Sequence, residues 1–268
     1  MSNPAESYEE YIVPALFEPW AAELMQRIVG HPGDDLLDVA CGTGIVARRS
    51  RPALGDESAV CGVDPNPNML AVARRASERE KVAVDWHEGR AEELPFPDAS
   101  FRMVLCQQGA QFFSDRPQGF AEMRRILDEE GRIATSTWLP IEHHPFFSAL
   151  NDAMQRHLGT AAASAPFTLG DAAEVKQLLS AAGFHDIEIE HVTLTAKYPD
   201  PERFLDETVN ALMAVVVSML DIGEDELARG VTAVKEELRE PLEAAVHDNV
   251  VHLPWHSHIA TAKVSPAR

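Results

Sequence analysis

The chain has 268 residues, of which 45% are apolar, and its formal net charge is −20. This composition supports a sizeable core and excludes a largely disordered chain. The 43 acidic residues against 23 basic ones argue against general binding to nucleic acid or to anionic membrane surfaces, because both present negatively charged phosphates.

The three cysteines, Cys41, Cys61 and Cys106, are far apart and form no C-x-x-C pair. Neither a disulfide framework nor a metal site is therefore expected. The first ten residues are polar and acidic, unlike a secretory signal. The longest nearly apolar run, 211–220, is too short to cross a bilayer. These features predict a cytoplasmic protein without membrane insertion.

Strands and helices alternate along the first half of the chain. Residues 8–29 have apolar side chains near helical spacing, divided by Pro14 and Pro19. This region precedes predicted strands at 36–40, 60–63, 82–86, 101–106 and 132–137, with helices between them at 45–51, 68–80 and 116–127. The alternation predicts a parallel sheet with helices on both faces.

The alternation of predicted strands and helices becomes less regular after residue 138. It becomes regular again with a helix over 171–182, which Asp171 is expected to cap. A long strand over 186–197 follows, then two helices within 201–247, and a last strand closes the chain near its end, over 250–263.

A glycine-containing turn follows the first predicted strand, in the string Leu37-Asp38-Val39-Ala40-Cys41-Gly42-Thr43-Gly44. Gly42 and Gly44 let the backbone approach a ligand closely. Asp64, at the end of the next strand, stands where an acid often binds ribose hydroxyls. These features alone fit either a nicotinamide dinucleotide or S-adenosylmethionine. Asp38 favours a ligand with an ammonium group, because a carboxylate there would repel a pyrophosphate.

The string from Asp38 to Gly44 resembles motif I of the class I S-adenosylmethionine-dependent methyltransferases. Residues 63–70, 89–101 and 123–132 resemble further motifs of the same family. The resemblance covers about residues 10–140 and is closest to the small-molecule branch that includes the ubiquinone and menaquinone C-methyltransferases.

The resemblance implies S-adenosylmethionine as cofactor and assigns roles to matched positions. Asp38 would help to hold the amino-acid end, Gly42 and Gly44 would line the methionine and ribose, and Asp64 would bind both ribose hydroxyls. Gln107 would lie beside the methionine moiety. The remaining implied binding positions surround the adenine or flank these residues: Ala40, Pro65, Asn66, Met69, Ala91 and Glu92.

Arg90 departs from the family pattern, which commonly has an aspartate there to receive the adenine amino group. A guanidinium has no acceptor for that hydrogen bond. Glu92, a backbone carbonyl or water would have to replace it.

Three aromatic residues of the first helices, Tyr11, Phe17 and Trp20, are candidates for a lid over the cofactor. A core stripe on an amphipathic helix explains the same spacing equally well.

Methyl transfer from a sulfonium is an in-line displacement, so alignment of donor and acceptor supplies much of the rate. A base is needed only when the acceptor keeps its proton. His143 and His144 are the candidate catalytic residues, because imidazoles titrate near neutral pH. A metal role for these two is disfavoured, since adjacent side chains point in different directions.

The resemblance and the element order together predict an α/β fold. We expect a Rossmann-like, mostly parallel seven-stranded sheet with helices on both faces, plus helical lid insertions. A single methyltransferase domain would cover 1–268, with the cofactor-binding core at about 30–138. Variable segments for substrate or lid are expected at 1–29, 139–170 and 200–247.

Apolar residues of the two later variable segments are candidates to line an acceptor pocket: Phe146, Phe147, Phe167, Phe204, Met213 and Met219. The sequence thus predicts methyl transfer to an O, N or C nucleophile of a small molecule. Two alternatives stay open, a non-catalytic regulator or partner protein that binds the cofactor, and an NAD(P)-dependent reductase, although no Tyr-x-x-x-Lys pair is evident. The oligomeric state is open, with a homodimer as one option.

Overall fold

The structure, a computed structural model, describes residues 4–28, 30–219 and 222–264, with 213–219 described by their backbone alone. The chain divides into two compact units. The first comprises residues 1–137, 171–192 and 257–268, and the second comprises 138–170 and 193–256.

The strands form one eight-stranded sheet. In chain order they are β1 (Leu36–Val39), β2 (Val60–Asp64), β3 (Asp85–Glu88), β4 (Phe101–Gln107), β5 (Leu127–Trp138), β6 (Phe184–Pro199), β7 (Val246–His247) and β8 (Val250–Val264). The spatial order is β3-β2-β1-β4-β5-β8-β6, and the short β7 pairs with β8. All pairs from β3 to β5 are parallel, which confirms the predicted α/β fold with a mostly parallel sheet.

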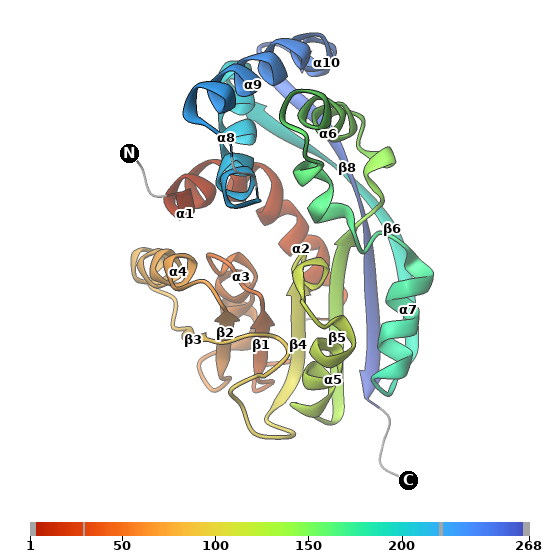
Figure 1. Cartoon of the computed structure of the whole chain (residues 1–268). Helices are drawn as coiled ribbons and strands as arrows, with labels where there is room; N and C mark the ends of the chain where they lie inside the picture. Colours follow the sequence, from red (N-terminus) through yellow and green to blue (C-terminus); the bar gives the residue numbers. More distant parts are fainter. Residues whose placement is uncertain (1–3, 29, 220–221, 265–268) are drawn as a thin grey trace. The chain divides into compact units, whose positions relative to one another are not determined.

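Helices surround the strands of the first unit. They are α1 (Pro4–Ser7), η1 (Tyr8–Phe17), α2 (Glu18–Gln26), α3 (Ile45–Leu54), α4 (Pro67–Glu80), η2 (Ala110–Phe112), α5 (Arg116–Arg125) and α7 (Ala172–Ala181). Helix α3 packs on β1 and β2, and α4 packs on β2 and β3, as Figure 1 shows. Asp171 caps α7 as predicted, since its side chain accepts a hydrogen bond from the Ala173 N–H.

The register of the parallel strands brings their carboxyl ends together. Asp38 of β1 lies opposite Gly62 of β2 and Leu105 of β4. Asp64 and Gln107, which end β2 and β4, therefore lie at the same edge of the sheet as the glycine turn after β1. Ligands of open α/β sheets bind at this edge.

The indole of Trp86 explains why two glycines stand beside this edge. A Cβ atom on Gly62 or on Gly44 would overlap with the Trp86 ring. Gly44 also has a φ of 83°, a left-handed conformation that side chains rarely adopt, and it caps the start of α3. The glycine turn is thus needed for packing as well as for approach to a ligand.

The second unit contains more helices than the sequence predicted. They are η3 (Ile141–His143), α6 (Pro145–Leu158), η4 (Ala162–Phe167), α8 (Pro201–Met219), α9 (Glu224–Glu237) and α10 (Arg239–Ala245). The prediction of two helices within 201–247 is wrong, because α10 forms a third. Helix α6 was not predicted, although its buried residues include Phe146, Leu150 and Met154 at helical spacing.

We expect Gly62→Ala to destabilise the protein by about 1–3 kcal/mol, because the new methyl group would meet the Trp86 ring in a packed interior. Thermal unfolding measures the effect. Gly223→Ala is the matched control, since no atom lies within 4 Å of a Cβ there. An unchanged melting temperature for Gly62→Ala would contradict the described packing of Trp86.

Candidate functional site

Asp64 is the best-oriented acid at the carboxyl edge of the sheet. Its Oδ2 accepts a hydrogen bond from the Gly42 N–H at 2.9 Å, and its Oδ1 accepts one from the Asn66 N–H at 2.8 Å. Each oxygen keeps capacity for one further donor. The carboxylate is therefore held rigidly by the glycine turn and can still bind two hydroxyl groups.

Asp38 lies deeper in the same unit and is almost inaccessible. The pKa of its carboxyl is raised to about 8, mainly by burial; a hydrogen bond from the Ala47 N–H opposes the shift, and the negative charge of Asp64 adds to it. A nearby cation would favour the charged form of Asp38. This acid is suited to a positively charged ligand group.

Tyr8, which the sequence did not indicate as a site residue, lies beside Phe17, whose carbonyl accepts a hydrogen bond from Gln107 at the end of β4. Burial raises the pKa of the Tyr8 hydroxyl, and the charges of Glu9, Asp64 and Asp38 raise it further. The Tyr8 and Phe17 rings lie 5.3 Å apart. Tyr8 and Phe17 thus form an aromatic pair near the carboxyl edge.

The winding of η1 explains why Tyr8 was missed. This segment is a π-helix, with about 4.4 residues per turn, so residues nine apart lie on nearly the same face. In an α-helix, with about 3.6 residues per turn, Tyr8 and Phe17 would lie on opposite faces. Tyr11 and Trp20, the other predicted lid residues, are buried.

Gln107 connects the end of β4 to this aromatic segment. Its Nε2 donates a hydrogen bond to the Phe17 carbonyl at 3.0 Å. Its Oε1 is buried and has no hydrogen-bond partner among the residues that the structure describes. The amide therefore offers one acceptor to a ligand beside the strand ends.

The Arg90 side chain is exposed and turns toward Ser114, whose Oγ accepts its hydrogen bond at 2.8 Å. Glu92 Oε1 accepts hydrogen bonds from the Ser114 N–H at 2.7 Å and from the Ser114 hydroxyl at 2.8 Å. Burial raises the pKa of Glu92, but hydrogen bonds from Ser114 and Asp115 outweigh that and lower it to about 2. This oxygen of Glu92 is already engaged, which argues against Glu92 as the substitute acceptor for an adenine amino group.

The other predicted binding positions fall around the same edge. Asn66 caps α4, since its Oδ1 accepts a hydrogen bond from the Asn68 N–H at 3.0 Å. Ala40 has a left-handed φ of 54° in the turn after β1. Pro65 is exposed, Met69 is half-buried and Ala91 is buried.

The two candidate catalytic histidines belong to the second unit and differ in their surroundings. His143 is exposed, whereas His144 is buried beside the rings of Phe167 and Trp255. His144 Nε2 accepts a hydrogen bond from the His256 N–H at 3.1 Å. Burial lowers the pKa of His144 to about 4. This arrangement favours a structural role for His144 over a role as base.

The second unit also contains a cavity of about 240 Å³. Phe146 and Phe147 line it together with Pro241, Leu253 and Pro254. Phe167 and Phe204 are buried in the core of this unit instead. The side chains of the remaining two candidates for an acceptor pocket, Met213 and Met219, lie outside the described residues.

The three cysteines are free and buried. Burial raises the pKa of the Cys106 thiol to about 12, so it is protonated at neutral pH. Over residues 4–28, 30–219 and 222–264, no helix has both the length and the apolar character needed to span a membrane. Within the same ranges, no three His, Cys, Asp or Glu side chains gather in a way that could hold a metal ion.

Comparison with known proteins gives consistent matches. Residues 37–135 match a family model described as a methyltransferase domain. The chain is 30% identical over 203 residues to nocamycin O-methyltransferase of Saccharothrix syringae, which is 70% of this chain and 72% of that protein. It is 35% identical over 121 residues to demethylmenaquinone methyltransferase of Deinococcus radiodurans, which is 45% of this chain and 50% of that protein.

The chain spans about half the length of the demethylmenaquinone methyltransferases that it matches. Among solved structures, a putative methyltransferase of Bacillus halodurans C-125 is similar with a TM-score of 0.59 and 22% identity, over 91% of this chain and 98% of that one. This likeness supports the fold.

We expect Asp38→Asn to raise the melting temperature by several degrees at about pH 8. The folded protein holds the Asp38 carboxyl protonated up to a pKa of about 8, whereas the unfolded chain loses this proton near its ordinary value of 3.8. This group therefore stabilises the fold fully below its unfolded pKa and loses that contribution as pH rises. Thermal unfolding of both proteins between about pH 4 and pH 8 should show the gain shrinking toward acid pH. A gain that is equal at every pH would contradict this expectation.

We expect His144 to contribute a loss of stability as pH falls from about 6.5 toward 4, because its neutral imidazole must take up a proton on unfolding, and this contribution opposes that of Asp38 over the same range. His144→Gln keeps an acceptor for the His256 N–H and should flatten this loss. His143→Gln, at the exposed neighbour, should leave it unchanged. Denaturant unfolding at several pH values measures the free energy of unfolding. Equal pH dependence in the natural chain, His144→Gln and His143→Gln would contradict the lowered pKa of His144.

Proposed function

The chain belongs to the class I S-adenosylmethionine-dependent methyltransferases, and from this premise we propose that it transfers a methyl group to an O, N or C atom of a small molecule. The matches to the methyltransferase family model and to nocamycin O-methyltransferase confirm the family and the cofactor predicted from motif I. The observation that carries the proposal is the Asp64 carboxylate, oriented by the Gly42 and Asn66 N–H groups at the end of β2.

The residues at the carboxyl edge fit S-adenosylmethionine chemically. Gly42 has a φ of 55°, and no atom lies within 4 Å of where its Cβ would be, so the turn is open to a ligand. Asp64 keeps acceptor capacity for two ribose hydroxyls, which are donors. Asp38 and the buried Oε1 of Gln107 suit the ammonium group of the amino-acid end.

Catalysis would then consist mainly of positioning. When bound, S-adenosylmethionine supplies a methyl group on a positively charged sulfonium that already carries its leaving group. Asp64 would fix the ribose, and Asp38 and Gln107 would orient the amino-acid end. Tyr8 and Phe17 would exclude water from the same edge. Holding donor and acceptor in line can supply much of the reduction in barrier.

We propose a partly apolar acceptor. The apolar cavity of the second unit, lined by Phe146 and Phe147, has room for a small organic group. The names of the two relatives refer to nocamycin and to demethylmenaquinone. Where the acceptor must lose a proton, the exposed His143 is the candidate base of the predicted pair, because the Nε2 of His144 is already occupied.

We further propose a cytoplasmic location, supported by three cysteines that are free and buried. The homodimer and the single-domain organisation stay predictions. Sedimentation of the purified protein would test the first, and the cooperativity of its unfolding would test the second.

Titration with S-adenosylhomocysteine tests the proposal. We expect micromolar binding, weakened by about tenfold to a hundredfold in Asp64→Asn through loss of charge-assisted hydrogen bonds. Asp171→Asn is the control, because asparagine caps a helix as well as aspartate does and Asp171 lies outside the site.

Binding of NADH in place of S-adenosylhomocysteine would overturn the proposal in favour of a reductase. Release of S-adenosylhomocysteine from S-adenosylmethionine during incubation with small phenols, amines and quinols would separate an enzyme from a binding protein without turnover.

A further inference from the structure

Helix α3 of the first unit carries a buried arginine, Arg48. The Arg48 side chain is 1% exposed, and it forms an ion pair with Glu9, itself 8% exposed, at 2.7 Å. A second ion pair joins Arg48 to Glu80. Arginine is almost never fully buried unless it is paired, so this side chain depends on its two acids.

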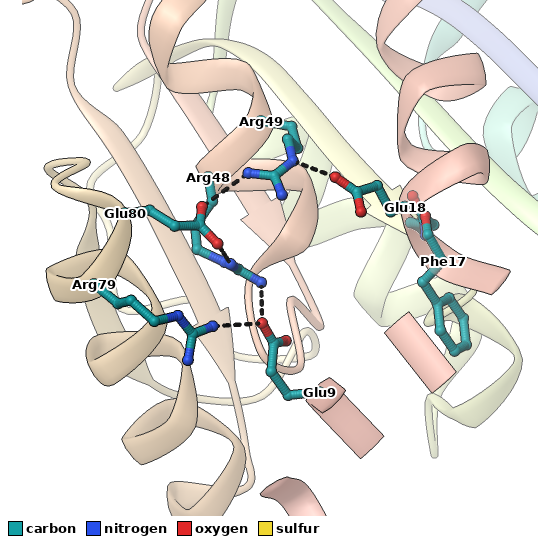
Figure 2. Close-up of polar contacts among 8 residues, drawn as sticks. Glu9, Phe17, Glu18, Arg48, Arg49, Arg79 and Glu80 are labelled. Carbon is teal, nitrogen blue, oxygen red and sulfur yellow. Dashed lines mark hydrogen bonds and ion pairs between the residues drawn. The ribbon is translucent and has the colours of Figure 1, made fainter. Parts of the chain in front are cut away.

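Arg48 is the centre of a larger set of ion pairs, which Figure 2 shows. Glu80 also binds Arg49 at 2.8 Å, and Arg49 binds Glu18 at 2.7 Å. Arg79 approaches Glu9 at 3.7 Å. We call this set the N-terminal charge network, and its members are Glu9, Glu18, Arg48, Arg49, Arg79 and Glu80.

The network contacts both ends of the aromatic segment η1, with a buried ion pair at the first end and an exposed one at the second. Glu9 is the second residue of η1 and directly follows Tyr8, while Glu18 directly follows Phe17. Their partners, Arg48 and Arg49, are consecutive residues of α3, the helix that starts at the glycine turn. The buried Glu9–Arg48 pair thus ties the start of this segment to the helix that shapes the cofactor site.

The same helix is connected to Asp38. The Ala47 N–H donates a hydrogen bond to Asp38 Oδ2 at 3.2 Å, and Arg48 is the next residue. A shift of Glu9 relative to Arg48 would therefore move Tyr8 relative to Asp38. The Gln107 bond to the Phe17 carbonyl fixes the other end of η1 to β4.

Stability alone is a weak explanation for the buried pair. Taking two charges out of water costs several kcal/mol per ion, and a well-packed apolar pair often stabilises a fold equally well. Arg48 Nε and Glu9 Oε2 are also buried without hydrogen-bond partners in the described part of the chain. A pair that leaves two polar atoms unsatisfied is better explained by the geometry that it fixes.

We propose that Arg48 is a positioning residue, which by way of Glu9 holds the Tyr8 and Phe17 rings at the carboxyl edge of the sheet, where Asp38 and Asp64 lie. This inference rests on the proposed cofactor site at those carboxylates. Arg48 itself would touch neither cofactor nor acceptor.

The test compares Glu9→Gln in two backgrounds, the natural chain and Tyr8→Ala. In the natural chain we expect the Kd for S-adenosylhomocysteine to rise about tenfold, mainly through faster dissociation. With Tyr8→Ala already present, Glu9→Gln should change the Kd by less than about twofold, because its effect passes through Tyr8. Its effect on the melting temperature should persist in both backgrounds.

Glu6→Gln is the matched control. Glu6 pairs with Arg75 at the same distance of 2.7 Å and joins α1 to α4, but both side chains are about half exposed. Exposed pairs contribute little, so this variant should leave the Kd and the melting temperature unchanged.

Arg48→Lys and hydrogen exchange provide a second measurement that needs no ligand. Lysine keeps the charge but lacks the planar fork that reaches two carboxylates. We expect amides of residues 8–17 to exchange at least about tenfold faster in Arg48→Lys, while β1, β2 and β4 keep their protection.

Three results would overturn the inference. These are an unchanged Kd in Glu9→Gln, an equal loss of affinity in both backgrounds, and unchanged exchange of residues 8–17 in Arg48→Lys. Absence of S-adenosylhomocysteine binding in the natural chain would instead refute the proposed function, while the exchange measurement would still decide whether Arg48 holds η1.

Discussion

Two acidic side chains buried at the ends of parallel strands are the constraint on which the rest of the first unit depends. Asp38 and Asp64 are both nearly inaccessible, burial raises the pKa of each carboxyl, and the charge of Asp64 raises the pKa of Asp38 further. Backbone N–H groups from Gly42, Asn66 and Ala47 offset part of this cost. Their donors come from the glycine turn and the starts of two helices, so the turn, the helices and the acids form one electrostatic unit. A ligand with hydroxyl donors at one end and a positive charge at the other completes it.

The same constraint explains the composition of the N-terminal segment. Side chains that cover buried carboxylates must be neutral or must bring their own counter-charge. The Tyr8 and Phe17 rings lie together in this segment, and Glu9 is paired with Arg48. Such local pairing is needed because a buried acid without a partner is strongly destabilising.

Much of the first unit could be predicted from the sequence, since short apolar strands, glycine turns and terminal acids have local causes. Asp38, Asp64 and Gln107 lie at the predicted strand ends for that reason. Tyr8 could not be predicted from a period of about 3.6, because its segment winds as a π-helix. The roles of Arg48 and Glu92 depend on partners distant in sequence, Glu9 and Ser114, which no local pattern indicates. Helix α6 was overlooked because its first residues, with Pro145 among them, are typical of a loop.

The path of the chain through the two units has a consequence for biosynthesis. The boundaries of the units fall within β5, β6 and β8 and once more between η4 and α7. Residues 257–264, which complete the first unit, are therefore translated after the whole of the second. On the ribosome the first unit cannot be completed before the second has been translated, although β1–β4 and most of β5 emerge earlier. A contiguous fragment of the chain would lack part of at least one unit. Recombination between homologues would therefore keep both units whole only if it exchanged residues 138–170 and 193–256 together.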